Sequence, residues 1–152
     1  LFPSTTLFRS EGSVFEPDYI QKCFSQGDLP PVKNANKSSY RLLSIKLKDT
    51  QEIIGFSDLY FGYPTSETAW ISIFIIHERY RKNGYAQEAL KMISEECKLR
   101  GYSKTGIAVY LKNWRALRFW TKAGFNTING IKGDKDFSEN TFARIELTMN
   151  LL

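Results

Sequence analysis

The strongest constraint in this sequence is a short cationic loop at which a strand pattern changes into a helix pattern. Residues 69–76 (AWISIFII) form an apolar run of strand length. Residues 85–100 then carry apolar side chains at helical spacing, and Gly101 stands where a glycine commonly ends a helix. Between the two runs lies the hexapeptide Arg81-Lys82-Asn83-Gly84-Tyr85-Ala86. The fold must therefore contain a strand, this loop and a helix in direct succession.

The hexapeptide has the features of an anion-binding loop. Backbone N–H groups at the start of a helix lack partners within the helix, and the macrodipole makes that end positive. Gly84 lets a ligand approach the backbone, and the small Ala86 leaves room for a diphosphate. The alternative is that Arg81 and Lys82 are solvated charges and Gly84 is only a turn residue. The loop lacks the Gly-Lys-Ser/Thr ending of a Walker loop and the glycines of a dinucleotide fingerprint.

The segment before this junction predicts a helix, a loop and a hairpin. Residues 16–25 are amphipathic, and residues 26–39 form a polar loop without periodicity. Residues 40–47 and 52–61 alternate in polarity on either side of a turn, which predicts an antiparallel pair. The face of the first helix that we expect to be buried carries Tyr19, Ile20, Cys23 and Phe24.

The segment after the junction predicts a strand, a second helix and a final strand pair. Residues 105–110 form the strand, and Asn113 can cap a helix whose inner face carries Leu117 and Trp120, with Trp114 as a further candidate. Gly124 closes that helix. The pair comprises residues 125–132 and 142–149, joined by 133–140. The whole order predicts an α+β fold on a mixed, mainly antiparallel central sheet flanked by helices.

Length and composition limit what such a chain can be. With 152 residues, of which 42% are hydrophobic, it fits one packed domain, which we expect to span residues 11–152. No apolar run is long enough to cross a bilayer. Two cysteines and a single histidine form neither a zinc-site spacing nor a disulfide framework, so we expect no metal, reduced thiols and a cytoplasmic location. The net charge of +5 suits any polyanion and does not discriminate among them.

The first ten residues are expected to be foreign to the domain. Leu1 to Ser10 (LFPSTTLFRS) closely resemble the in-frame translation of a sequencing-library adapter. They lack the basic region and cleavage site of a signal peptide. We expect a cloning or assembly scar that has replaced the natural N-terminus, with an ordinary first strand as the alternative.

A second segment, taken together with the junction, indicates a resemblance to a known family. The string Asn113-x-x-Ala116-x-x-Phe119-Trp120-x-Lys122-x-Gly124-Phe125 follows the hexapeptide after one helix and one strand. Together the two segments resemble the GCN5-related N-acetyltransferase (GNAT) family, which transfers an acyl group from acyl-coenzyme A to an amine. Arg81-x-x-Gly84-x-Ala86 matches the family's pyrophosphate motif, Q/R-x-x-G-x-G/A. The resemblance covers about residues 40 to 150.

The resemblance implies a set of contacts to acetyl-CoA as co-substrate. Backbone groups of Phe74, Ile75 and Ile76 would bind the pantetheine arm, and Asn113 would bind the pantetheine or the acyl-sulfur end. The family's sheet splays between the strand ending near Ile76 and the next strand, which would form a slot for the cofactor. The diphosphate would lie on Arg81, Lys82, Asn83, Gly84, Tyr85 and Ala86.

Several residues are candidates for the acid and the base of the reaction. The resemblance puts Trp120 where the family commonly has a tyrosine acid, yet an indole N–H has no useful acidity. Trp120 is then either a packing residue or a mark of lost catalysis, and Tyr110 or Tyr85 could act instead. For the base, Asp58 could attract a cationic amine, and His77 alone has an ordinary pKa near neutrality. Glu67 is a further candidate, a capping role is favoured for His77, and deprotonation through water stays open.

Two functions follow as hypotheses. The first is an acyl-CoA-dependent N-acetyltransferase in which a primary amine attacks the thioester directly. The second is a catalytically silent acyl-CoA-binding or regulatory module. We expect the acceptor to be a small-molecule amine or an amine of a peptide or protein. The loops 26–39 and 133–140 are expected at the entrance to its site, and the segment 27–31 either lines that entrance or is a plain linker. We expect a monomer or homodimer with no membrane and no nucleic-acid partner, because the basic residues are scattered and no recognition motif is present.

Overall fold

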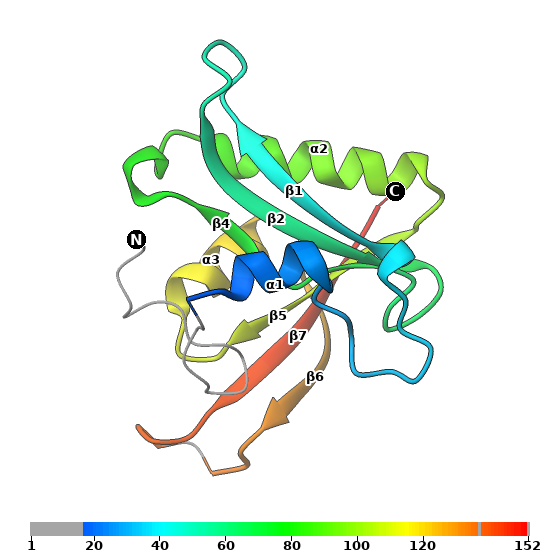
Figure 1. Ribbon diagram of the computed structural model, residues 1–152. Coiled ribbons are helices and arrows are strands. Elements are labelled where there is room, and N and C mark those ends of the chain that lie inside the picture. The colour runs from blue at the N-terminus through cyan, green and yellow to red at the C-terminus, as the bar shows by residue number, and fades with distance from the viewer. Residues whose placement is uncertain (1–16, 137, 152) are drawn as a thin grey trace.

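The computed structural model describes residues 17–136 and 138–151 (Figure 1). The predictions for residues 1–10, and for the start of the first helix at residue 16, lie outside the described residues. The described part holds seven strands and three α-helices in the predicted order. The predicted segments agree with the observed ones to within a few residues, apart from the strand at 69–76, which is divided in two.

The strands form one sheet in the order β1-β2-β3-β5-β7-β6, with β4 paired to β2 beside this path. β3 and β5 are parallel, and every other strand pair is antiparallel. The prediction of a mixed, mainly antiparallel sheet is therefore confirmed. The strands are β1 (Tyr40–Lys46), β2 (Ile53–Phe61), β3 (Thr68–Ile71), β4 (Phe74–Ile76), β5 (Lys104–Tyr110), β6 (Thr127–Gly133) and β7 (Ala143–Asn150).

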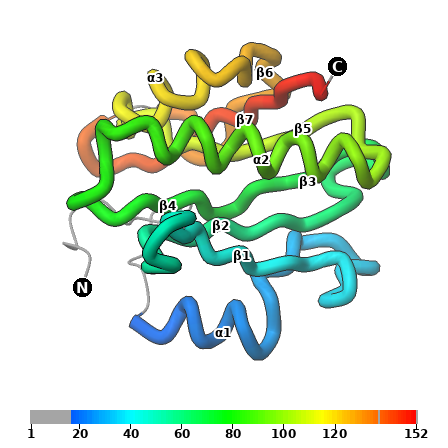
Figure 2. Tube along the Cα trace, turned by 90° about the horizontal axis from the view of Figure 1, so that it is seen from above, coloured from blue at the N-terminus to red at the C-terminus, as the bar shows by residue number. Residues whose placement is uncertain are grey.

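Helices cover both faces of this sheet (Figure 2). α2 (Tyr85–Leu99) and α3 (Trp114–Lys122) share one face, whereas the short α1 (Tyr19–Ser25) lies on the other. Successive residues of a strand point to opposite faces, so Leu59 of β2 packs with α2 and its neighbour Tyr60 packs with α1. Two single-turn 3₁₀ helices, η2 (Lys37–Ser39) and η3 (Glu78–Tyr80), precede β1 and α2.

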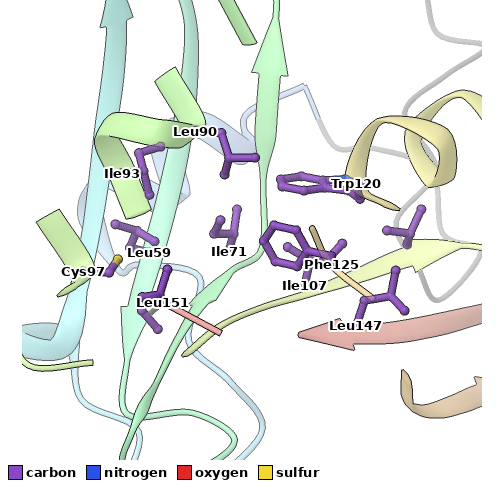
Figure 3. Packing of buried hydrophobic residues seen from close by; sticks show 12 residues of the cluster. Leu59, Ile71, Leu90, Ile93, Cys97, Ile107, Trp120, Phe125, Leu147 and Leu151 are labelled. Carbon is purple, nitrogen blue, oxygen red and sulfur yellow. The ribbon is translucent and has the colours of Figure 1, made fainter. Parts of the chain in front are cut away.

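The larger core lies between the sheet and the helices α2 and α3. Figure 3 shows Leu90 and Ile93 of α2 and Trp120 of α3 gathered around Ile71 and Ile107 of the sheet. Each such side chain contributes on the order of 1.5–3 kcal/mol when removed from water. This packing fixes where α2 and α3 begin, and the cavity described below lies at those two helix starts.

Three expectations about packing and pairing were wrong. Phe24 is 70% exposed, because α1 buries only the stripe formed by Tyr19 and Cys23. Trp114 is 76% exposed at the first position of α3. The apolar run at 69–76 is not one strand, since Ser72 and Ile73 separate β3 from β4. Both described cysteines are buried free thiols.

Candidate active site

The cavity lies where two neighbouring strands part. β3 pairs with β5 as far as Ile71 opposite Ile107. Beyond that point β4 pairs with β2, and within the described part of the chain it has no second strand neighbour. The predicted splay of the sheet is therefore present. A cavity of about 860 Å³ lies at this split, within the range of small-ligand sites.

The cavity reaches both faces of the sheet. Ala86 and Trp120 line it from the helices of the α2 and α3 face. Tyr19 and Trp70, which pack together on the α1 face, line it too. The slot thus runs through the sheet, with an α2 end and an α1 end.

The exposed edge of β4 offers backbone groups to the slot. Asp58 N–H donates to the Ile73 carbonyl and His77 N–H to the Ile54 carbonyl, and Ile75 lies opposite Phe56 between these bonds. The alternation of an antiparallel pair then turns the polar groups of Ile75 toward β2 and those of Phe74 and Ile76 toward the slot. Of the three residues expected to serve a ligand by backbone contacts, Phe74 and Ile76 are so oriented and Ile75 is not.

The α2 end of the cavity is rich in unpaired backbone amides. Gly84 caps α2 with φ of 83°, and Lys82 also has a positive φ of 66°. Among the described residues, no acceptor faces the backbone N–H groups of residues 82–87. A Cβ built on Gly84 would meet nothing within 4 Å, so open space lies above it. An anion in that space would face several donors at the positive end of a helix.

The cations of this loop differ in what they do. The half-buried Arg81 donates from Nε to the Ile76 carbonyl at 2.9 Å, which ties the loop to the end of β4. Lys82 and Asn83 are exposed, whereas Tyr85 and Ala86 are half-buried. All of them except Asn83 line the cavity, and Arg115 of α3 adds a further cation that sequence reasoning missed.

Asn113 lies at the start of α3. Its Oδ1 accepts a hydrogen bond from Ala116 N–H at 3.1 Å, so the predicted cap is confirmed. Asn113 also lines the cavity. Because Oδ1 is engaged in the cap, a ligand contact would use the amide Nδ2 as donor.

Trp120 is packed among aromatic rings. Its ring lies 5.5 Å from Phe74, 5.1 Å from Phe119 and 4.9 Å from Phe125, measured between centroids. The side chain is 8% exposed and borders the cavity. Such edge contacts add to the burial energy, so Trp120 helps to fix α3 against β4.

The other acid and base candidates are dispersed. Tyr110 lines the cavity and stacks on Phe142 at 5.7 Å, and Tyr85 borders it at the start of α2. His77 caps η3, where its Nδ1 accepts from Arg79 N–H at 3.3 Å. Glu67 lies elsewhere, at the start of β3, and its hydrogen bond from Lys104 is the main reason why its pKa is lowered.

Asp58 is buried and does not line the cavity among the described residues. Its Oδ1 accepts from both Ser72 N–H and Ile73 N–H at 2.9 Å, and its Oδ2 accepts from Tyr40 at 3.2 Å. Burial raises the pKa of Asp58 to about 7, although these hydrogen bonds lower it. The carboxylate is therefore held by hydrogen bonds and does not face the slot.

The α1 end of the cavity is formed by side chains that sequence reasoning largely missed. The segment 28–31 lines it, as was considered for that loop, whereas no described residue of 133–140 does. Glu146 of β7 pairs with Lys132 at 3.0 Å and lies near Arg144 at 3.8 Å. A carboxylate within the apolar pattern of β7 was the one signal in the sequence that could have pointed to Glu146. Glu146 lines the cavity, and the other polar and aromatic side chains at this end include Tyr19, Asp28, Tyr63, Trp70 and Arg144.

Comparison with known proteins agrees with this geometry. The chain matches the Acetyltransferase (GNAT) family over residues 7–125, more than half its length, and it belongs to that family. The resemblance deduced from the two motifs is thereby confirmed. The uncharacterized N-acetyltransferase YycN of Bacillus subtilis (strain 168) is 28% identical over 98 residues, which cover 63% of this chain and 62% of YycN. The chain thus spans less than two thirds of that relative.

Solved structures share the fold. A Bacillus subtilis acetyltransferase in complex with CoA has a TM-score of 0.62 at 22% identity, over 76% of this chain and 79% of that one. A GNAT acetyltransferase of Elizabethkingia anophelis with acetyl-CoA bound has a TM-score of 0.64 at 21% identity, over 89% and 83%. The Streptococcus mutans protein smu.2055 reaches 0.70 at 21% identity, over 98% and 89%.

Two further observations concern ions and membranes. Between residues 17 and 151, Phe137 aside, no group of three or more His, Cys, Asp or Glu side chains could hold a metal ion. None of the helices described in that range combines the length and apolar character that crossing a bilayer requires.

Proposed function

We propose that this protein is an acetyl-CoA-dependent N-acetyltransferase that moves an acetyl group to a primary amine by direct attack on the thioester. The observation that carries the proposal is the row of backbone N–H groups at residues 82–87, which opens onto the cavity beside the free edge of β4. Two of the similar structures named above bind CoA or acetyl-CoA in a fold of this kind.

The residues present fit a coenzyme A diphosphate. The amides of residues 82–87 and the cations Lys82 and Arg115 would hold the phosphates, and open space above Gly84 accommodates them. The backbone groups of Phe74 and Ile76, with Nδ2 of Asn113, would hold the amide-bearing arm. Acetyl-CoA supplies an acetyl group activated as a thioester.

The α1 end of the cavity suits the amine acceptor. Asp28 and Glu146 contribute carboxylates there, and the rings of Tyr63 and Trp70 meet edge to face with centroids 5.4 Å apart. Carboxylates and aromatic faces both attract ammonium groups. The chain's main contribution to rate would be to hold amine and thioester together, since orientation alone can supply a large share of a barrier of this kind.

Binding is tested first, by calorimetry with coenzyme A. Gly84→Val places a branched side chain over the amides and should weaken affinity at least tenfold, about 1.4 kcal/mol. Because any side chain is strained at the positive φ of Gly84, the matched control is Gly101→Val. Gly101 has φ of 87°, a Cβ there would also meet nothing within 4 Å, and it follows the other end of α2. Equal affinities for the two variants would refute the diphosphate site.

Transfer is tested by release of free thiol from acetyl-CoA across a panel of small amines and lysine peptides. Turnover with at least one acceptor, and an acetylated amine in the product, supports the enzyme. The second candidate, a catalytically silent acyl-CoA-binding module, is favoured by Trp120, which cannot donate a proton as a tyrosine does. Tight coenzyme A binding without thiol release on any acceptor would favour that module.

A further inference from the structure

The strand that forms the edge of the slot contains one extra residue. Trp70 lies opposite Tyr60 of β2, and Phe74 lies opposite Ser57. Four steps along β3 and β4 therefore match three steps along β2, which is a β-bulge at Ser72 and Ile73. A bulge bends its strand and is common beside active sites. Here it falls at the point where the strand leaves β5 and the slot opens.

The bulge is held by Asp58 of β2. The two N–H groups that the bulge removes from regular pairing, those of Ser72 and Ile73, both donate to Asp58 Oδ1 at 2.9 Å. The Ile73 carbonyl is held from the same strand, because it accepts Asp58 N–H at 3.1 Å and the Ser57 hydroxyl at 2.9 Å. These hydrogen bonds to the bulge all come from two adjacent residues of β2, Ser57 and Asp58.

We propose that Asp58 is a positioning residue for acyl transfer: its carboxylate holds the Ser72–Ile73 bulge and thereby orients the free N–H groups of β4 toward the thioester. The inference rests on the proposed N-acetyltransferase function. Asp58 itself does not reach the cavity, so it acts only through the backbone that it binds. Phe74 is the first residue after the bulge whose backbone N–H and carbonyl groups face the slot.

The surroundings of Asp58 hold its carboxylate in one position. Tyr40 of β1 donates to its Oδ2, and Cys23 of α1 lies against Tyr40. Asp28, in the loop after α1, is a like charge that also raises the pKa of Asp58. Burial is the largest cause of that rise, to about 7. The described residues supply no cation partner to this carboxylate, so the backbone N–H groups and one hydroxyl compensate its charge.

The first test compares Asp58→Ala with Asp58→Asn. Alanine removes the acceptor of both bulge N–H groups, whereas the asparagine Oδ1 keeps it. Since a displacement of about 1 Å can cost about 100-fold in rate, kcat for Asp58→Ala should fall at least tenfold. The Kd of coenzyme A should change less than about threefold, because the diphosphate site at residues 82–87 does not depend on the bulge and only the contacts of the amide-bearing arm to β4 do. Asp58→Asn should keep kcat within about threefold of the wild type.

The control for general destabilisation is Ile93→Ala, which removes a buried side chain of α2 outside the cavity lining. It should lower thermal stability while leaving kcat nearly unchanged below the transition. Three results would overturn the proposal: full kcat in Asp58→Ala, parallel loss of kcat and coenzyme A affinity, or an equal loss in Asp58→Asn. Absence of turnover in the wild type with intact coenzyme A binding would instead refute the proposed function.

A second measurement uses the wild type and does not depend on whether Asp58→Ala folds. In ¹H–¹⁵N spectra followed from pH 5 to 9, the amides of Ser72 and Ile73 should titrate with one midpoint near 7. The Phe74 amide, which does not bond to Asp58, should titrate with them if the carboxylate sets the strand. All three should be flat in Asp58→Asn. A Phe74 amide that does not follow the other two would contradict the positioning role.

Discussion

At its α2 end the cavity presents backbone amides from one continuous stretch, residues 82–87, whereas at its α1 end it presents side chains from α1, β3, β7 and the loop at 28–31. The first end suits an anion through groups that every residue carries, so it needs only a glycine with positive φ and a helix start. The second end depends on which side chains the fold brings together. A family can thus retain the first end while the second changes with the acceptor.

Trp120 borders the cavity from the α2 and α3 face, and its replacement should have the largest effect on stability. Trp120→Ala would open a cavity among Phe74, Phe119 and Phe125 and cost about 3–5 kcal/mol. Trp120→Tyr should cost about 1–3 kcal/mol and leave acyl transfer equal or slower, because packing is the role that the ring contacts support. Denaturant melts and initial rates measure both quantities. If leaving-group protonation limits turnover, Trp120→Tyr would instead be faster, approaching about 100-fold.

The pH dependence of stability should reveal Asp58, which holds the bulge between β3 and β4. Its pKa is about 7 in the folded chain, above the ordinary carboxyl value, so the folded state binds the proton more tightly. Its contribution to stability is fully present below the unfolded pKa and is lost as the pH rises through about 7, by a few kcal/mol. Unfolding free energies of wild type and Asp58→Asn from pH 4 to 8 should diverge accordingly. A constant difference across that range would contradict this linkage.

The acceptor end should respond to charge removal without affecting coenzyme A. Asp28→Asn should raise the KM for a cationic amine about fivefold, while the KM for acetyl-CoA stays constant. Glu67→Gln is the matched control, because it removes one carboxylate from the far end of β3, where Glu67 pairs with Lys104 at 2.6 Å. Equal effects of the two variants on the amine would show that only net charge matters and that Asp28 has no place in the acceptor site.

The same contrast explains how much could be predicted from the sequence. The α2 end was predictable because Arg81 to Ala86 are adjacent in the chain, and Asn113 caps the helix that its position indicated. The bulge was not, since an unbroken apolar run gives no signal of a kink and the carboxylate that fixes it lies 14 residues upstream. Periodicity also overstates burial in short helices, as the exposed Phe24 shows.

The α1 end, which we propose as the acceptor end, could mostly not be predicted from the sequence for a related reason. Glu146 and Asp28 are far apart in the chain, and they meet at one cavity only because β7 pairs with β5 while α1 folds over β2. Contacts that depend on tertiary pairing leave no local spacing to recognise. Only the proline-containing segment at 28–31 was considered as a lining, on the basis of its stiffness.

The smallest expected effect concerns the exposed cation of the amide loop. Lys82 has φ of 66°, a conformation that asparagine tolerates better than most residues, so Lys82→Asn removes the charge without adding strain. Exposed charges near a helix start contribute about 0.3–1 kcal/mol at low ionic strength, so the Kd for coenzyme A should rise about two- to fivefold. Raising the salt to about 0.5 M should shrink that difference, because screening acts on exposed charges first. Lys91→Asn on the outer side of α2, where the side chain is 78% exposed, should not change the Kd at either salt concentration. If Lys82→Asn leaves the Kd unchanged at low salt, the backbone amides alone bind the diphosphate, and the contrast between the two ends becomes sharper still.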